Sequence, residues 1–166
     1  MKNVLLLFLA LAAVFTVPAG AEDAGYPEAK PELALAVPEG WKTRYEDGKL
    51  YVTTTDELSV VIEVSGLKAT KKDGSAALAE MKSQVNEAFK NVTFEAMEQG
   101  GGANVGFYIL NGKGEDDDGE VIINALMVTN GDNDKVYFVF VAASPEGAKE
   151  HSEDLAKVIG SIRKVD

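Results

Sequence analysis

The only histidine of the chain, His151, is the side chain best suited to proton transfer near neutral pH. A serine–histidine–acid set for nucleophilic catalysis would have to use it. Its neighbour Ser152 points about 100° away around a helix, so the two side chains do not meet. His151 also lies one helical turn before Leu155, beside the apolar face of the last predicted helix. We therefore interpret it as a packed or rim histidine with one hydrogen bond, and we predict no catalytic residue.

Carboxylates are the other abundant chemical groups, and they gather in two predicted loops, 115–118 and 132–134. Calcium is the ion that we consider for such oxygen ligands. Neither loop has the alternating ligands and final glutamate of a calcium-binding hand. The loops also flank a predicted strand, 120–129, which at ~3.3 Å per residue would hold them roughly 30 Å apart. We interpret both as solvated turns and predict no metal ligand, with a weak Ca²⁺ site as the alternative.

The residues that most cofactor and covalent chemistry requires are missing from the sequence. There is no cysteine, which excludes disulfides, thiolate catalysis and cysteine-ligated zinc. The glycine-rich stretches 100–102 and 111–114 are not followed by the Gly-Lys-Ser/Thr of a phosphate-binding loop. No cofactor is therefore predicted. A pair of carboxylates could still support a small hydrolase, which stays open as an alternative function.

Aromatic side chains give the clearer indication of binding. Trp41, Tyr45 and Tyr51 fall together on the first predicted hairpin. Aromatic anchors at the rim of a domain commonly serve protein interfaces. We therefore name these three as candidate partner-binding residues. The alternative is that Trp41, which directly follows a turn, fills the core instead.

The charge balance restricts the class of partner. The chain has 16 Lys and Arg against 27 Asp and Glu, a formal net charge of −11. Such a balance repels phosphate backbones and anionic membrane surfaces, so nucleic acid is not an expected partner. A solvated acidic surface, a basic partner or a cation would each be compatible with it.

Residues Met1 to Ala21 have the order of a secretory signal peptide: Lys2, an apolar run over 4–17, and small residues at Ala19 and Ala21. As a helix the run would be roughly 21 Å long, too short for a ~30 Å hydrocarbon core. We predict cleavage after Ala21 and a secreted or periplasmic protein without a stable membrane anchor. An uncleaved anchor is the alternative.

The first half of the remaining chain predicts one domain that begins near Leu33. Residues 22–32 read as a flexible N-terminal segment, because they contain two prolines, a glycine and several charges. Strands are expected over 33–37 and 58–65, with a hairpin between them that turns at Asp47-Gly48. Apolar residues at helical spacing then predict an amphipathic helix over 76–90.

The second half predicts four more strands and a closing helix. The strands are expected over 92–99, 103–111, 120–129 and 135–142, with a turn at 100–102 and an acidic loop at 112–119. The helix opens at Ser144-Pro145. Short connections favour an antiparallel sheet, and the nearly continuous apolar runs in its last two strands indicate cover on both faces. The fold class is thus α+β within a single domain, 33–166, with a helix on each face. The alternative is that both helices cover one face of the sheet and that dimerisation covers the other.

The chain resembles the PsbP-like superfamily, which includes many small exported proteins of unknown role. The resemblance covers roughly 33–164 and rests on Pro38-Glu39-Gly40-Trp41, the hairpin after it, the helix near 75–90 and the closing helix through 158–162. It implies an α/β/α sandwich that serves as a binding or assembly module, mostly without catalysis. Our leading hypothesis is a non-enzymatic exported module that binds a protein partner in an accessory or assembly role. The sequence does not indicate the oligomeric state.

Overall fold

The computed structural model describes residues 22–56, 60–102, 104–131 and 133–165. The predicted signal peptide lies outside these residues, as do Leu58 and Asp132. Within them, no helix is both long and apolar enough to cross a membrane.

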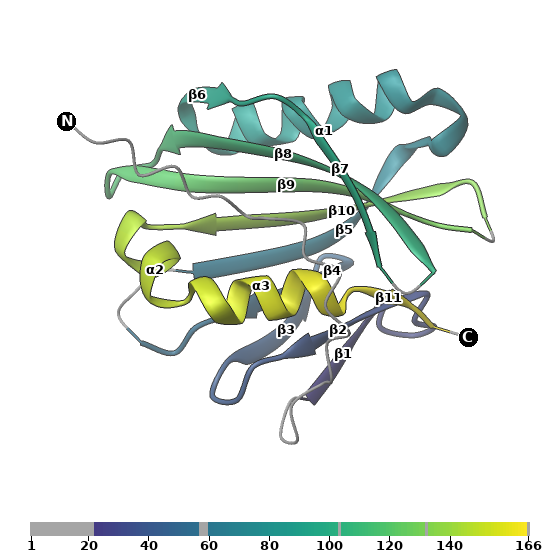
Figure 1. Cartoon of the computed structure of the whole chain (residues 1–166), viewed down its shortest axis with the longest axis horizontal. Helices are drawn as coiled ribbons and strands as arrows, with labels where there is room; N and C mark the ends of the chain where they lie inside the picture. Colours follow the sequence, from purple (N-terminus) through teal and green to yellow (C-terminus); the bar gives the residue numbers. More distant parts are fainter. Residues whose placement is uncertain (1–21, 57–59, 103, 132, 166) are drawn as a thin grey trace.

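A large antiparallel sheet forms the centre of the molecule, as the sequence predicts (Figure 1). Its strand order is β3-β4-β5-β10-β9-β8-β6, and a further strand, β7, also pairs with β8. The bounds are β3 Lys42–Glu46, β4 Lys49–Thr53, β5 Val60–Thr70, β6 Lys90–Phe94, β7 Glu98–Gly102, β8 Val105–Glu115, β9 Glu120–Asn130 and β10 Lys135–Ala143. The β3–β4 hairpin turns at Asp47 and Gly48, whose positive φ values of 50° and 72° confirm the predicted turn.

One face of this sheet is covered by helix α1 (Gly74–Ala88), which follows a short 3₁₀ turn, η1 (Lys71–Asp73). The Asp73 carboxylate caps α1 by accepting a 3.0 Å hydrogen bond from the Ala76 main-chain N–H. Three buried side chains, Ala77, Met81 and Val85, pack this helix onto apolar residues of the sheet. The helix confirms the predicted amphipathic segment.

The opposite face is covered by helices α2 (Pro145–Glu150) and α3 (Ser152–Ser161). Ser144 caps α2 as predicted, because its hydroxyl accepts a 3.0 Å hydrogen bond from the Gly147 main-chain N–H. One continuous helix was expected here, but the chain breaks at His151, the residue between the two helices. Leu155 and Val158 of α3 are buried against the sheet.

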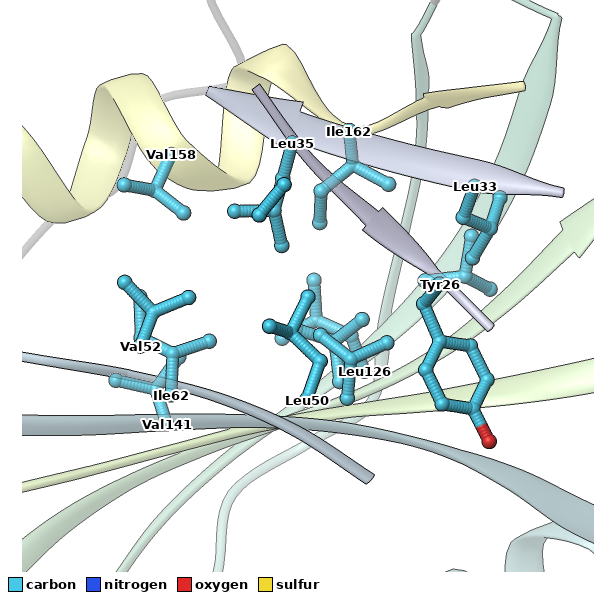
Figure 2. Close-up of a cluster of buried hydrophobic side chains, with 14 of the residues drawn as sticks. Tyr26, Leu33, Leu35, Leu50, Val52, Ile62, Leu126, Val141, Val158 and Ile162 are labelled. Carbon is cyan, nitrogen blue, oxygen red and sulfur yellow. The ribbon is translucent and has the colours of Figure 1, made fainter. Parts of the chain in front are cut away.

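A second sheet shares this face with α3 and was not predicted. It has three strands in the order β1-β2-β11: β1 Glu22–Tyr26, β2 Leu33–Val37 and β11 Arg163–Lys164. Figure 2 shows Leu33 and Leu35 of β2 with Val158 and Ile162 above the apolar side chains of the large sheet. The helix-on-each-face architecture is therefore confirmed, with the small sheet as an additional part of one layer.

The flexible segment expected over 22–32 is wrong for its first half, because residues 22–26 form strand β1. Ala24 and Tyr26 are only 5% and 8% exposed and belong to the core. The sequence pattern did not indicate this strand, because residues 22–32 contain prolines, a glycine and charges. Only alternate residues of β1 face the core.

Three further boundaries also differ from prediction, and glycines lie at two of them. The strand expected over 92–99 is two strands, β6 and β7; the glycines 100–102 lie inside β7; and β8 extends through 112–115. A Cβ at Gly100 would lie 2.4 Å from the Phe107 ring, and one at Gly112 would lie 2.5 Å from the Thr93 carbonyl oxygen. These glycines permit close approach between neighbouring groups, whereas the sequence favoured turns at them.

Candidate functional site

His151 lies in a small cluster with Trp41 and Asp56. Its Nε2 is 2.7 Å from an Asp56 carboxylate oxygen. Its ring meets the Trp41 indole edge-on, with ring centroids 5.5 Å apart. The described hydrogen bond of His151 thus runs to a carboxylate, which agrees with a packed rim histidine with one hydrogen bond. The cluster ties the segment after β4 to the break between α2 and α3.

The three candidate partner-binding aromatics do not share one surface. Trp41 is half-buried and packs against the core cluster on the side of the sheet that α3 covers. Tyr45 is exposed, and its hydroxyl donates a 2.7 Å hydrogen bond to the Gly25 carbonyl oxygen of β1. Tyr51 pairs with Arg44 on the opposite face of the hairpin, where the guanidinium lies 5.0 Å from its ring centroid. The alternation of strand side chains therefore separates Tyr51 from the other two.

The acidic loops lie at opposite ends of β9, as predicted. In the first, Asp117 pairs with Lys90 at 2.9 Å, and Asp116 accepts hydrogen bonds from the main-chain N–H groups of Asp118 and Gly119. In the second, Asp134 pairs with Lys72 at 2.5 Å. Among the described residues, no group of three acidic or histidine side chains is arranged to hold a metal ion.

A wide, open groove of about 580 Å³ lies on the small sheet. Volumes of this order accommodate ligands or peptide side chains. All three strands of the small sheet contribute to it, and the turn between β7 and β8 adds Asn104. The lining residues are Asp23, Gly25, Pro31, Ala34, Asn104, Arg163, Lys164 and Val165.

The floor of this groove is built by an ion pair across the middle strand. Arg163 of β11 and Asp23 of β1 bond to each other, although β2 separates their strands. Only small side chains, Ala34 and Ala36, lie on this face of β2, and both are buried. Short side chains in the middle strand therefore let the guanidinium reach the carboxylate. The first and last strands of the described chain are joined at the groove.

A polar cluster fastens the small sheet to the large one nearby. Glu32, just before β2, accepts hydrogen bonds from the Tyr137 hydroxyl and from Lys135, the latter at 2.7 Å. Burial raises the pKa of Tyr137 to about 12, and the Glu32 carboxylate adds to this shift. Hydrogen bonds from Lys135 and then Tyr137 lower the pKa of Glu32.

Sequence reasoning missed both the groove and this polar cluster. Their charged residues are far apart in the chain: Asp23 is 140 positions from Arg163, and Glu32 is 103 positions from Lys135. A local pattern does not record such pairs. The one available signal was the alternation of small and large residues in Leu33–Val37, where the alanines mark the face that the ion pair crosses.

No protein-family model and no curated protein matches this sequence. Solved structures do match its fold. Cyanobacterial PsbP from Synechocystis matches with a TM-score of 0.60 and 11% identity, over 95% of this chain and 99% of its own. LpqN, involved in cell envelope biogenesis of Mycobacterium tuberculosis, matches with a TM-score of 0.56 and 11% identity, over 89% of this chain and 93% of its own. The Ran-binding protein Mog1p of Saccharomyces cerevisiae matches with a TM-score of 0.53 and 10% identity, over 88% of this chain and 96% of its own.

These similarities span nearly the whole length of each chain, so the protein has a PsbP-like fold. The resemblance inferred from the sequence is confirmed at this level. Identities of this size establish the fold alone, because one fold supports many functions.

Proposed function

We propose that this protein is a non-enzymatic exported module that binds a protein partner, and that the groove on the small sheet is its docking site. The observation that carries the proposal is the groove itself, a concave surface of about 580 Å³ lined by charged, polar and small residues. Such a surface suits recognition by shape and charge. An accessory or assembly role is consistent with the fold, since Mog1p, which shares it, is a Ran-binding protein.

The chemistry of the groove favours binding over catalysis. Its charged side chains are Asp23, Arg163 and Lys164, and the first two are engaged with each other. A nucleophile with an adjacent base, which covalent catalysis needs, is not among its lining residues. The histidine lies elsewhere, packed on Trp41.

Charged substitutions on the groove walls test the proposal. Pro31 and Asn104 are exposed, so Pro31→Glu with Asn104→Asp adds two negative charges while leaving the core intact. Asp suits the positive φ of 62° at position 104 as well as Asn does. Ala88→Glu with Thr93→Glu adds the same charge at exposed positions of α1 and β6 and serves as the control.

The measurement is affinity capture of the mature protein and its variants from the native compartment. We expect one partner to be retained by the wild type and the control and lost from the groove variant. Equal retention by all three would contradict a docking site in the groove.

The enzyme alternative has a separate test. If the protein has a hydrolytic activity and His151→Ala abolishes it, that alternative would be favoured.

A further inference from the structure

The outermost strand of the large sheet, β3, has an accessible edge. It stands at one end of the strand order, and its described pairing is with β4 on the inner side. All five of its residues, Lys42–Glu46, are exposed. A strand edge of this kind is a template for pairing with another strand.

The hairpin turn determines which main-chain groups face outward. With a two-residue turn at Asp47-Gly48, Glu46 and Lys49 form the first hydrogen-bonded pair, and the bonding then alternates along the strands. Arg44 is therefore bonded to β4. The N–H and C=O groups of Thr43 and Tyr45 point away from β4, toward the open edge.

The sequence of β3 is complementary to itself in antiparallel orientation. In the register that pairs all five residues, Thr43 lies opposite Tyr45 of a second copy, so the outward-facing groups of both strands meet. Lys42 then lies opposite Glu46 of the second copy, and Glu46 lies opposite Lys42 of the second copy. Residues opposite each other across a sheet share a face, so two pairs of opposite charge form.

We propose that two copies of this chain associate through β3 in this register, with a two-fold axis at Arg44 and a sheet continuous across both copies. The two Arg44 side chains meet at the axis. Each is already engaged within its own hairpin, by Glu46 at 3.1 Å and by the Tyr51 ring.

The edges of β1 and β6 do not have this property. Strand β1 carries Glu22 and Asp23 and no cation, so the same register places Glu22 opposite Tyr26 and forms no pair of opposite charge. Strand β6 self-paired about its centre would place Lys90 opposite Phe94. On a chain of net charge −11, β3 carries two cations and one carboxylate, so the excess of negative charge that drives two copies apart is not found on this strand.

Charge-exchange variants test the proposal on the mature chain, residues 22–166. Lys42→Glu or Glu46→Lys alone turns both opposite-charge contacts into like-charge contacts. We expect each to weaken the dimer about tenfold or more in sedimentation equilibrium, and the double variant to restore it. A wild-type protein that stays monomeric up to about 1 mM would overturn the proposal. So would a dimer that both single variants leave unchanged.

Disulfide formation tests the register, because the chain contains no cysteine. Position 44 faces itself across the axis as a non-hydrogen-bonded pair, with Cα atoms about 4.5 Å apart, within the ~4.4–6.8 Å range of disulfides. Position 43 meets its copy only diagonally, at about 7–8 Å. Under mild oxidation we expect Arg44→Cys to form a covalent dimer at least tenfold faster than Thr43→Cys. Equal rates would contradict the register.

Discussion

At the scale of single residues, the Tyr137 hydroxyl joins two layers of the molecule through one carboxylate. Its ring is 2% exposed, and its hydroxyl donates to Glu32, which precedes β2 of the small sheet. The Tyr26 ring of β1 meets the same tyrosine edge-on, with centroids 6.3 Å apart. The buried hydroxyl is therefore satisfied by a charge from the other sheet.

Replacing Glu32 by glutamine should destabilise the fold and ease ionisation of Tyr137. A neutral acceptor bonds the hydroxyl more weakly than a carboxylate, and the Glu32 side chain is 25% exposed, so we expect a loss of about 1 kcal/mol in urea unfolding. The pKa of Tyr137, about 12, should fall in a spectroscopic titration. An unchanged tyrosine titration would show that the carboxylate does not act on this hydroxyl.

The same carboxylate should make stability depend on pH. The pKa of Glu32 is lower in the folded state, so its contribution is present above the unfolded pKa and disappears as the pH falls through the folded value. The pKa of Tyr137 is raised, so its contribution is complete below about 10 and disappears as the pH rises through about 12. Unfolding free energies of wild type and Glu32→Gln should therefore differ at pH 7 and converge in acid. A constant difference from pH 7 to the acid range would contradict this.

The single tryptophan offers a direct probe of the His151 cluster. His151→Ala removes the ring that packs against Trp41 and the histidine that bonds to Asp56. We expect the fluorescence emission of Trp41 to shift to longer wavelength and stability to fall by about 1 kcal/mol. Substitution of Ser152, the next residue, should leave the emission unchanged. If His151→Ala leaves the spectrum of Trp41 unaltered, the packing role is wrong.

At the scale of elements, strand β1 is joined to the core by two buried side chains, Ala24 and Tyr26. Tyr26 is 8% exposed within the core, whereas Tyr45 of the neighbouring hairpin is 36% exposed. Tyr26→Ala should therefore lower the unfolding free energy by about 3 kcal/mol or more, and Tyr45→Ala by less than about 1 kcal/mol. Equal effects in chemical denaturation would mean that β1 does not form part of the core.

The elements that sequence reasoning predicted well are those whose information is local. Asp47-Gly48 identifies its hairpin, Ser144-Pro145 opens α2, and the apolar runs of β9 and β10 mark the centre of the sheet. Each of these elements is indicated by a short run of neighbouring residues that forms a turn, a helix cap or an apolar strand.

The elements that it missed depend on distant partners. Strand β11 is two residues long and exists because it pairs with β2, more than a hundred positions earlier. The glycines of β7 signal a turn locally, yet Gly100 is in a strand because β7 pairs with β8, and the Phe107 ring opposite it leaves no room for a side chain. The groove follows from these same long-range contacts, so only the α/β layers around it could be predicted.

At the scale of the whole molecule, the two ends of the described chain meet in the small sheet. β1 follows directly after Ala21, the predicted cleavage site, and β11 lies near the C-terminus (Figure 1). The Asp23–Arg163 pair links them at the groove. A chain processed at Ala21 would thus begin with a strand that helps to form the proposed docking site.

The most direct test of that docking site is site-specific photo-crosslinking in the native compartment. A benzophenone side chain at Pro31, on the groove wall, should give one discrete adduct with a partner protein, and the same group at Ala88, on α1, should give none. Adducts from position 88 but not from position 31, or none from either, would contradict the proposed function.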